Sequence, residues 1–187
     1  MARHVTSRLA IGIALVTLAA CGGKDDPLSA KPKEEQPGQG CPSAELGNFS
    51  GNASGAASGK LAGCAYYLVE TDNEDGSSAF GLVLMNGAPL SGTPVINIAV
   101  EGGRPAVGTY SIGLDTAGFF GGVFVEGSRN FLASSGSITI KSSSASGVSG
   151  SVSLSASEVG SNAQISISGD FSAKCLKAES SSSTFSC

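Results

Sequence analysis

Two stretches near the end of the chain decide the fold: VSGSVSLSA at residues 148–156 and ISISGDFSAKC at residues 165–175. Apolar and polar residues alternate along both of them. Successive side chains of a β-strand point to opposite faces, so this alternation predicts two strands with one buried and one solvated face. The residues predicted to face the core are Val148, Val152, Leu154, Ala156, Ile165, Ile167, Phe171, Ala173 and Cys175.

The preceding chain carries further strand signals, namely β-branched and aromatic runs separated by Gly, Pro, Asn and Asp. The run AFGLVLM at 79–85 is almost wholly apolar, which predicts burial on both faces. Part of 41–60 is a candidate edge strand, although its glycines weaken that prediction. The other expected strands lie at 61–70, 94–100, 106–113, 119–126 and around Ile138 and Ile140.

These patterns predict an all-β fold, because no stretch after Ala20 shows an apolar stripe with helical period. About eight strands separated by turn signals predict an antiparallel β-sandwich. A closed or partly closed β-barrel is the alternative, since the same alternation serves both architectures.

The first 20 residues have the pattern of a cleaved, helical secretory signal peptide. Residues 1–8 are basic, and residues 9–20 (LAIGIALVTLAA) carry no charge. As a helix, that apolar run spans roughly 18 Å. A bilayer core is about 30 Å thick, so a permanent transmembrane helix is not expected.

The sequence Leu18-Ala19-Ala20-Cys21 resembles the lipobox of bacterial lipoproteins. The resemblance implies that Cys21 carries fatty acyl groups such as palmitate and becomes the first residue after cleavage. An ordinary secreted protein is the alternative, but Leu18 is large where signal peptidase prefers a small residue. Gly22 follows in place of the Asp of inner-membrane retention, which favours the outer membrane and leaves open which side of it.

The mature chain divides into a tether and one domain. Residues 21–40 hold the lipidated cysteine and a Pro-, Gly- and charge-rich segment that cannot bury a core, which predicts a disordered tether. Residues 41–187 fit a single β domain. Without Arg3 and Arg8, nine basic residues face 15 acidic ones, a formal charge of −6. This charge and the lack of a basic stripe argue against nucleic-acid binding.

Four cysteines remain after Cys21, and an even number in an exported protein predicts two disulfides. Cys64 lies in the first strong strand and Cys175 in the last, and chain termini tend to lie close together. This favours Cys64–Cys175 with Cys41–Cys187. Pairing of Cys41 with Cys64 and of Cys175 with Cys187 is the main alternative.

Four strings show a second resemblance. They are SGSITI at 135–140, GVSGSVSL at 147–154, ISGDFSA at 167–173 and RPAVGTY at 104–110. Together they resemble uncharacterised β-rich bacterial envelope lipoproteins over much of residues 48–173. That group has no agreed activity, so the resemblance implies a β-rich fold and supplies no catalytic residue.

Catalytic signals are weak in this chain, and no cofactor is expected. The single histidine, His4, lies in the signal peptide, which excludes histidine-based triads and histidine-ligated metals in the mature protein. Paired carboxylates are the remaining option for a hydrolase. The candidates are Glu70, Glu101, Asp115, Glu126, Glu158 and Asp170.

Two other groups of residues are candidate binding sites. The acidic turn Asp72-Asn73-Glu74-Asp75 is a weak calcium candidate, because the spacing of an EF-hand loop fails there. If the sheet closes as a barrel, aromatic side chains are candidates to line a ligand pocket, although such residues more often fill a core. These aromatic residues are Tyr66, Tyr67, Phe119, Phe120, Phe124 and Phe131.

The sequence therefore predicts a membrane-anchored envelope lipoprotein with a structural or binding β-domain that is not an enzyme. A carrier of a small apolar ligand and a carboxylate-dependent hydrolase are the alternatives. The expected partners are the membrane, through Cys21, and an envelope protein or a small ligand that the sequence does not identify.

Overall fold

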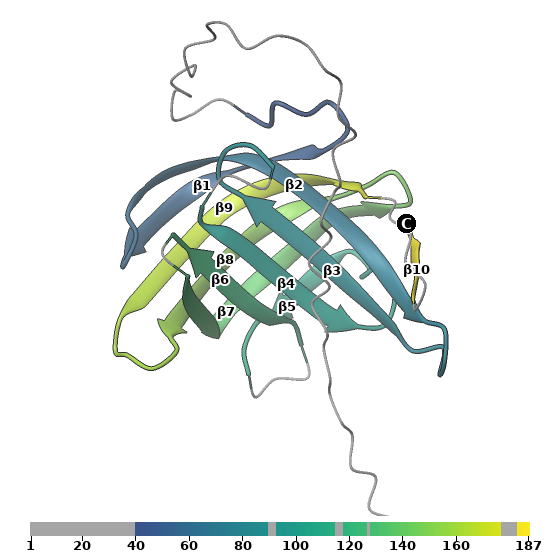
Figure 1. Ribbon diagram of the computed structural model, residues 1–187. Coiled ribbons are helices and arrows are strands. Elements are labelled where there is room, and N and C mark those ends of the chain that lie inside the picture. The colour runs from purple at the N-terminus through teal and green to yellow at the C-terminus, as the bar shows by residue number, and fades with distance from the viewer. Residues whose placement is uncertain (1–39, 90–92, 115–117, 127, 177–182) are drawn as a thin grey trace, which may run out of the picture. The chain divides into compact units, whose positions relative to one another are not determined.

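The computed structural model describes residues 40–89, 93–114, 118–126, 128–176 and 183–187, and all regular structure in them is β (Figure 1). Within these ranges there is no helix long and apolar enough to cross a membrane. The strands are β1 (Gly47–Gly55), β2 (Gly59–Asp72), β3 (Ser78–Met85), β4 (Val95–Glu101), β5 (Gly108–Ser111), β6 (Phe120–Val125), β7 (Arg129–Ser144), β8 (Gly147–Glu158), β9 (Gln164–Cys175) and β10 (Ser183–Ser186).

Eight of these strands form a closed antiparallel barrel. Their order is β1-β9-β8-β7-β6-β4-β3-β2, and β1 pairs with β2 to close the circle. The all-β class is thus confirmed, and the barrel, the alternative to the sandwich, is the architecture that forms. Closure depends on β1, which arises from the glycine-rich stretch 41–60 and pairs along one edge with β9 and along the other with β2.

Two short strands lie outside this circle. β5 pairs with β7 over Ile138 and Ile140, beyond the part of β7 that pairs with β6. β10 pairs with the end of β2, from Val69 to Asp72. β2 is longer than β1, so the remaining part of its edge is covered first by a short parallel pairing with β9 and then by β10.

The predicted alternation is confirmed in β8 and β9. Their serines lie on the outside of the barrel, and the predicted core residues lie inside, with Phe171 only 4% exposed. Cys175, at the end of β9, is only half-buried. The run 79–85 departs from its prediction. Phe80, Leu82 and Leu84 are buried, but Gly81 and Val83 face outward and are half-buried, because no second layer of strands covers them among the described residues.

Both disulfides form, but with the alternative pairing, so the predicted Cys64–Cys175 and Cys41–Cys187 pairs are wrong. Cys41 joins Cys64 and Cys175 joins Cys187, with Cα atoms 4.4 and 5.5 Å apart. Cys175 lies opposite Tyr67, three residues or roughly 10 Å along β2 from Cys64, which is too far for a disulfide.

The registers in which β1 and β10 pair with β2 explain the observed disulfides. Asn48 of β1 lies opposite Cys64, and its side-chain carbonyl accepts a hydrogen bond of 3.0 Å from the Cys41 backbone N–H. At the other end of the chain Ser186 lies opposite Val69, which brings Cys187 beside the end of β9. β2 and β9, the strands that carry Cys64 and Cys175, are neighbours as expected. Each of these two cysteines nevertheless bonds to a cysteine that is close to it in the sequence.

Candidate functional site

The interior of the barrel is filled by side chains. Aromatic rings pack along it, with centroids 5.7 Å apart for Tyr67 and Phe80 and 6.3 Å apart for Phe80 and Phe119. The Tyr67 hydroxyl donates to the backbone carbonyls of Ser144 and Ala145, both at 2.9 Å, so its polar end is satisfied. Aliphatic residues from all eight barrel strands complete the core.

The six aromatic residues considered for a pocket are divided by the barrel wall. Tyr67, Phe119 and Phe131 are at most 1% exposed and belong to the core. The other three lie on the outside, because each occupies an outward position of its strand. They are Tyr66, Phe120 and Phe124. The sequence alone does not show which of these aromatic residues face inward. Inward and outward residues are adjacent in the pairs 66–67 and 119–120, and no polar residues alternate with them there.

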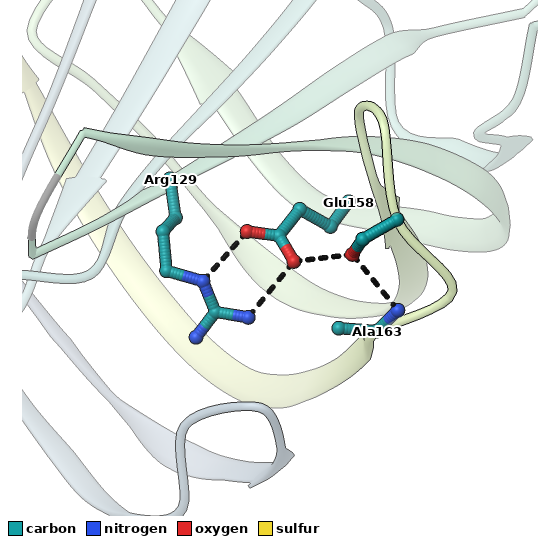
Figure 2. Close-up of polar contacts among 4 residues, drawn as sticks. Arg129, Glu158 and Ala163 are labelled. Atoms are coloured by element: carbon teal, nitrogen blue, oxygen red, sulfur yellow. Dashed lines mark hydrogen bonds and ion pairs between the residues drawn. The ribbon is translucent and has the colours of Figure 1, made fainter.

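An ion-pair cluster lies at one rim of the barrel (Figure 2). Arg129 at the start of β7 donates to Glu158 at the end of β8, with Nε–Oε1 and Nη2–Oε2 distances of 2.6 and 3.0 Å. The Ser161 hydroxyl donates to Glu158 and accepts from the Ala163 backbone N–H. The Arg129 guanidinium also lies over the ring of the buried Phe131, 5.1 Å from its centroid.

These hydrogen bonds lower the pKa of Glu158 to about 2, with Arg129 as the largest cause and Ser161 as the second. A carboxyl group with such a pKa is ionised at neutral pH and is a poor general acid. The other described carboxylate candidates are dispersed. Glu70 accepts from Ser183, and Asp170 pairs with Lys141 in an exposed ion pair. Asp115 lies outside the described residues.

The acidic turn 72–75 connects β2 to β3 and is organised by its own backbone. The Asp72 carboxylate accepts from the Glu74 N–H at 2.6 Å, and the Asp75 carboxylate accepts from the Ser77 N–H at 2.7 Å. The bonds from Ser77 lower the pKa of Asp75. Among the described residues there is no group of three or more His, Cys, Asp or Glu that could hold a metal ion. The turn has the geometry of a hydrogen-bonded hairpin loop.

One side of the barrel's outer surface is polar. Outward positions on β1, β9, β8 and the second half of β7 carry small hydroxyl and amide side chains. Together with residues 60–62 at the start of β2, they line an open hollow of about 850 Å³. Lys141 and Asp170 form an ion pair of 3.0 Å beside it. We call this surface the serine face; its residues are Ser50, Asn52, Ser137, Thr139, Ser151, Ser153, Ser168 and Asp170.

The opposite run of strands, β2, β3, β4, β6 and the first half of β7, presents a different outer surface. Residues paired directly across antiparallel strands share a face. One row across the wall contains Tyr66, Val83 and Leu132, with Asn97 and Gly122 between them. We call this surface the apolar face; its large residues are Tyr66, Leu68, Val83, Phe120, Phe124 and Leu132.

Glycines flatten the apolar face. The Phe124 ring lies over Gly122, where an added Cβ would be 3.9 Å from Phe124 Cε2. Leu68 covers Gly81 in the same way, at 3.6 Å. Phe124 and Leu132 are nevertheless both 37% exposed, and the partial burial of Tyr66 raises the pKa of its phenol. Large apolar side chains therefore meet solvent across adjacent strands.

The predicted lipidation site Cys21 and the tether up to residue 39 lie outside the described residues. The described domain begins at Gly40, directly before the cysteine that is bonded to β2. Comparison of the chain with models of protein families, with curated proteins and with solved structures gave no match.

Proposed function

We propose that this protein is a lipid-anchored protein of the bacterial cell envelope, attached through acyl groups on Cys21, whose barrel has a structural or binding role. The observation that carries the proposal is the agreement of the basic start, the uncharged run 9–20 and the lipobox ending at Cys21. Several acyl chains give a stable anchor where one does not.

Three features of the domain support an exported protein without a catalytic role. Both cysteine pairs of the domain are disulfide-bonded, as is usual in oxidising compartments outside the cytosol. The filled core favours a structural or binding role over transport of an apolar ligand inside the barrel. The carboxylates of Glu70, Glu158 and Asp170 each form a contact with a different partner, which also weakens the hydrolase alternative.

The first prediction concerns Cys21. Replacement of Cys21 by Ser removes the thiol that would be acylated, so the variant should lose fatty-acid label and should leave the membrane fraction or persist as the uncleaved precursor. Metabolic labelling with a radioactive fatty acid, followed by fractionation of the envelope, measures both effects. Replacement of Ser29 by Ala in the tether is a matched control and should change neither result. Label that persists in Cys21→Ser would overturn the proposal.

A further inference from the structure

The outer wall of the barrel has two unlike halves. On the serine face, the outward side chains are small and polar, and Thr139 forms a 3.0 Å hydrogen bond with Thr109 of the neighbouring β5. On the apolar face, outward positions carry aromatic and aliphatic side chains. Exposed apolar surface that spans adjacent elements marks a site of contact with a protein or a membrane.

The three central rows of the apolar face contain no charged side chain among the described residues. Paired positions there are Leu68, Gly81, Ala99 and Phe120 in one row, and Val95 with Phe124 in another. The polar groups within these rows are the half-buried Asn97 amide, the exposed Asn130 amide opposite Phe124, and the Tyr66 phenol. Acidic residues begin at the ends of the strands, with Glu70 on β2 and Glu101 on β4. An uncharged centre with a charged margin suits an apolar occupant.

The point where the tether joins the barrel identifies that occupant. Cys64 occupies an outward position of β2, two residues before Tyr66, and its disulfide fixes Cys41 there with a Cα–Cα distance of 4.4 Å. The chain that leads back to Cys21 therefore leaves the domain at the margin of the apolar face. A flexible chain of the length of residues 22–40 has an r.m.s. span of about 25 Å. A lipid at its end would keep this face within reach of the bilayer surface.

We propose that the apolar face is a membrane-docking surface, which lays the barrel sideways on the bilayer that holds its anchor and turns the serine face toward water. The inference rests on the proposed lipid anchor. Tyr66, Phe120 and Phe124 would lie at the level of the headgroups, where aromatic side chains are favoured. Because the centre of the apolar face is uncharged, docking should depend little on the salt concentration or on anionic lipid.

The chain has no tryptophan, so one introduced tryptophan is a unique fluorescent reporter. The test uses the mature lipidated protein in phosphatidylcholine vesicles, with Phe124→Trp on the apolar face and Ser153→Trp on the serine face as the matched control. The emission maximum of Phe124→Trp should lie at a shorter wavelength than that of Ser153→Trp. Brominated lipid should quench Phe124→Trp at least about twofold more than it quenches Ser153→Trp. High salt should leave the difference unchanged. Leu132→Trp is a second reporter on the same face, should Phe124→Trp fail to fold.

Three results would overturn the inference. Equal quenching of the two reporters would show that the barrel has no preferred side. A blue shift of Phe124→Trp without vesicles that grows with protein concentration would show that a second copy covers the face. The same shift at every concentration would show that the chain's own residues cover it. A failure of the proposed lipid anchor can be distinguished from a failure of docking, because without the anchor the protein would not sediment with the vesicles.

Discussion

At the scale of single residues, the sequence identified Glu158 only as one of six candidate carboxylates and did not indicate its ion-pair partner. Its partner Arg129 is 29 residues away, and the contact exists because β7 and β8 pair in one register at the rim of the barrel. Periodicity predicts on which face a residue lies. It does not predict which residue from another strand lies beside it.

The Arg129–Glu158 contact predicts a pH-dependent stability. The pKa of Glu158 is lowered to about 2 in the folded protein from an ordinary value of 4.5, so its contribution is complete above about pH 4.5 and is lost as the pH falls toward 2. Replacement of Glu158 by Gln should lower the Tm at pH 7 and should flatten the fall of Tm between pH 5 and pH 2. Thermal unfolding followed by circular dichroism across this range measures both.

Replacement of Asp170 by Asn is the control for this experiment. Asp170 also forms an ion pair, but both partners are more than half exposed, and such pairs contribute little to stability. This variant should keep the Tm and the pH dependence of the unchanged protein. An identical pH profile for Glu158→Gln would mean that the rim cluster does not stabilise the fold.

At the scale of elements, the sequence predicted best where alternation was strict. The serines of β8 and β9 identified both strands, their inner faces and their positions to within a few residues. β1 was only weakly indicated because glycine and asparagine supply little apolar signal. The outward exposure of Val83 was missed because a wholly apolar run does not show which of its faces is covered.

Two neighbouring residues of β9, one facing inward and one facing outward, provide a test of the predicted alternation. Phe171 is 4% exposed and points inward, while Ser172 is exposed on the outside. Replacement of Phe171 by Asp buries an unpaired charge and should destabilise the protein by at least about 3 kcal/mol. Replacement of Ser172 by Asp should change the free energy of unfolding by at most about 0.5 kcal/mol. Urea denaturation of both variants measures the difference, and equal midpoints would contradict the inward placement of Phe171.

At the scale of the whole molecule, a barrel forms instead of a sandwich because β1 pairs with both β2 and β9 and so closes the sheet. β1 fits between β2 and β9 because Gly51 lies opposite Gly169. A Cβ on Gly51 would come within 2.2 Å of the Ser168 carbonyl oxygen, and one on Gly169 within 2.8 Å of Phe49 Cε2. Gly51, one of the glycines that weakened the prediction of this strand, is thus also a residue that allows closure. Composition alone does not show this, since it requires knowing which glycines meet.

The closed hydrogen-bonded wall predicts that the barrel survives the loss of either disulfide. Cys41–Cys64 closes a separation of 23 residues and Cys175–Cys187 one of 12, and both lie beside strands already paired through their backbones. In the chain-entropy model each such link contributes about 3 kcal/mol. The variant Cys41→Ala/Cys64→Ala should therefore unfold cooperatively at lower denaturant, and Cys175→Ala/Cys187→Ala should behave similarly.

The same variants test the pairing, because the two possible connectivities predict different products. With the observed pairs, removal of Cys41 and Cys64 leaves the link between Cys175 and Cys187 intact. With the pairing that the sequence favoured, the same removal would break both links and expose two free thiols, and it would cost much more stability, because a loop of 100 residues alone contributes about 4.7 kcal/mol in the same model. Non-reducing peptide mapping of the Cys41→Ala/Cys64→Ala variant should recover the peptides of Cys175 and Cys187 as one linked species. Free thiols at both positions would show that the terminal strands are held together by crossed disulfides and that the register of β10 on β2 is wrong.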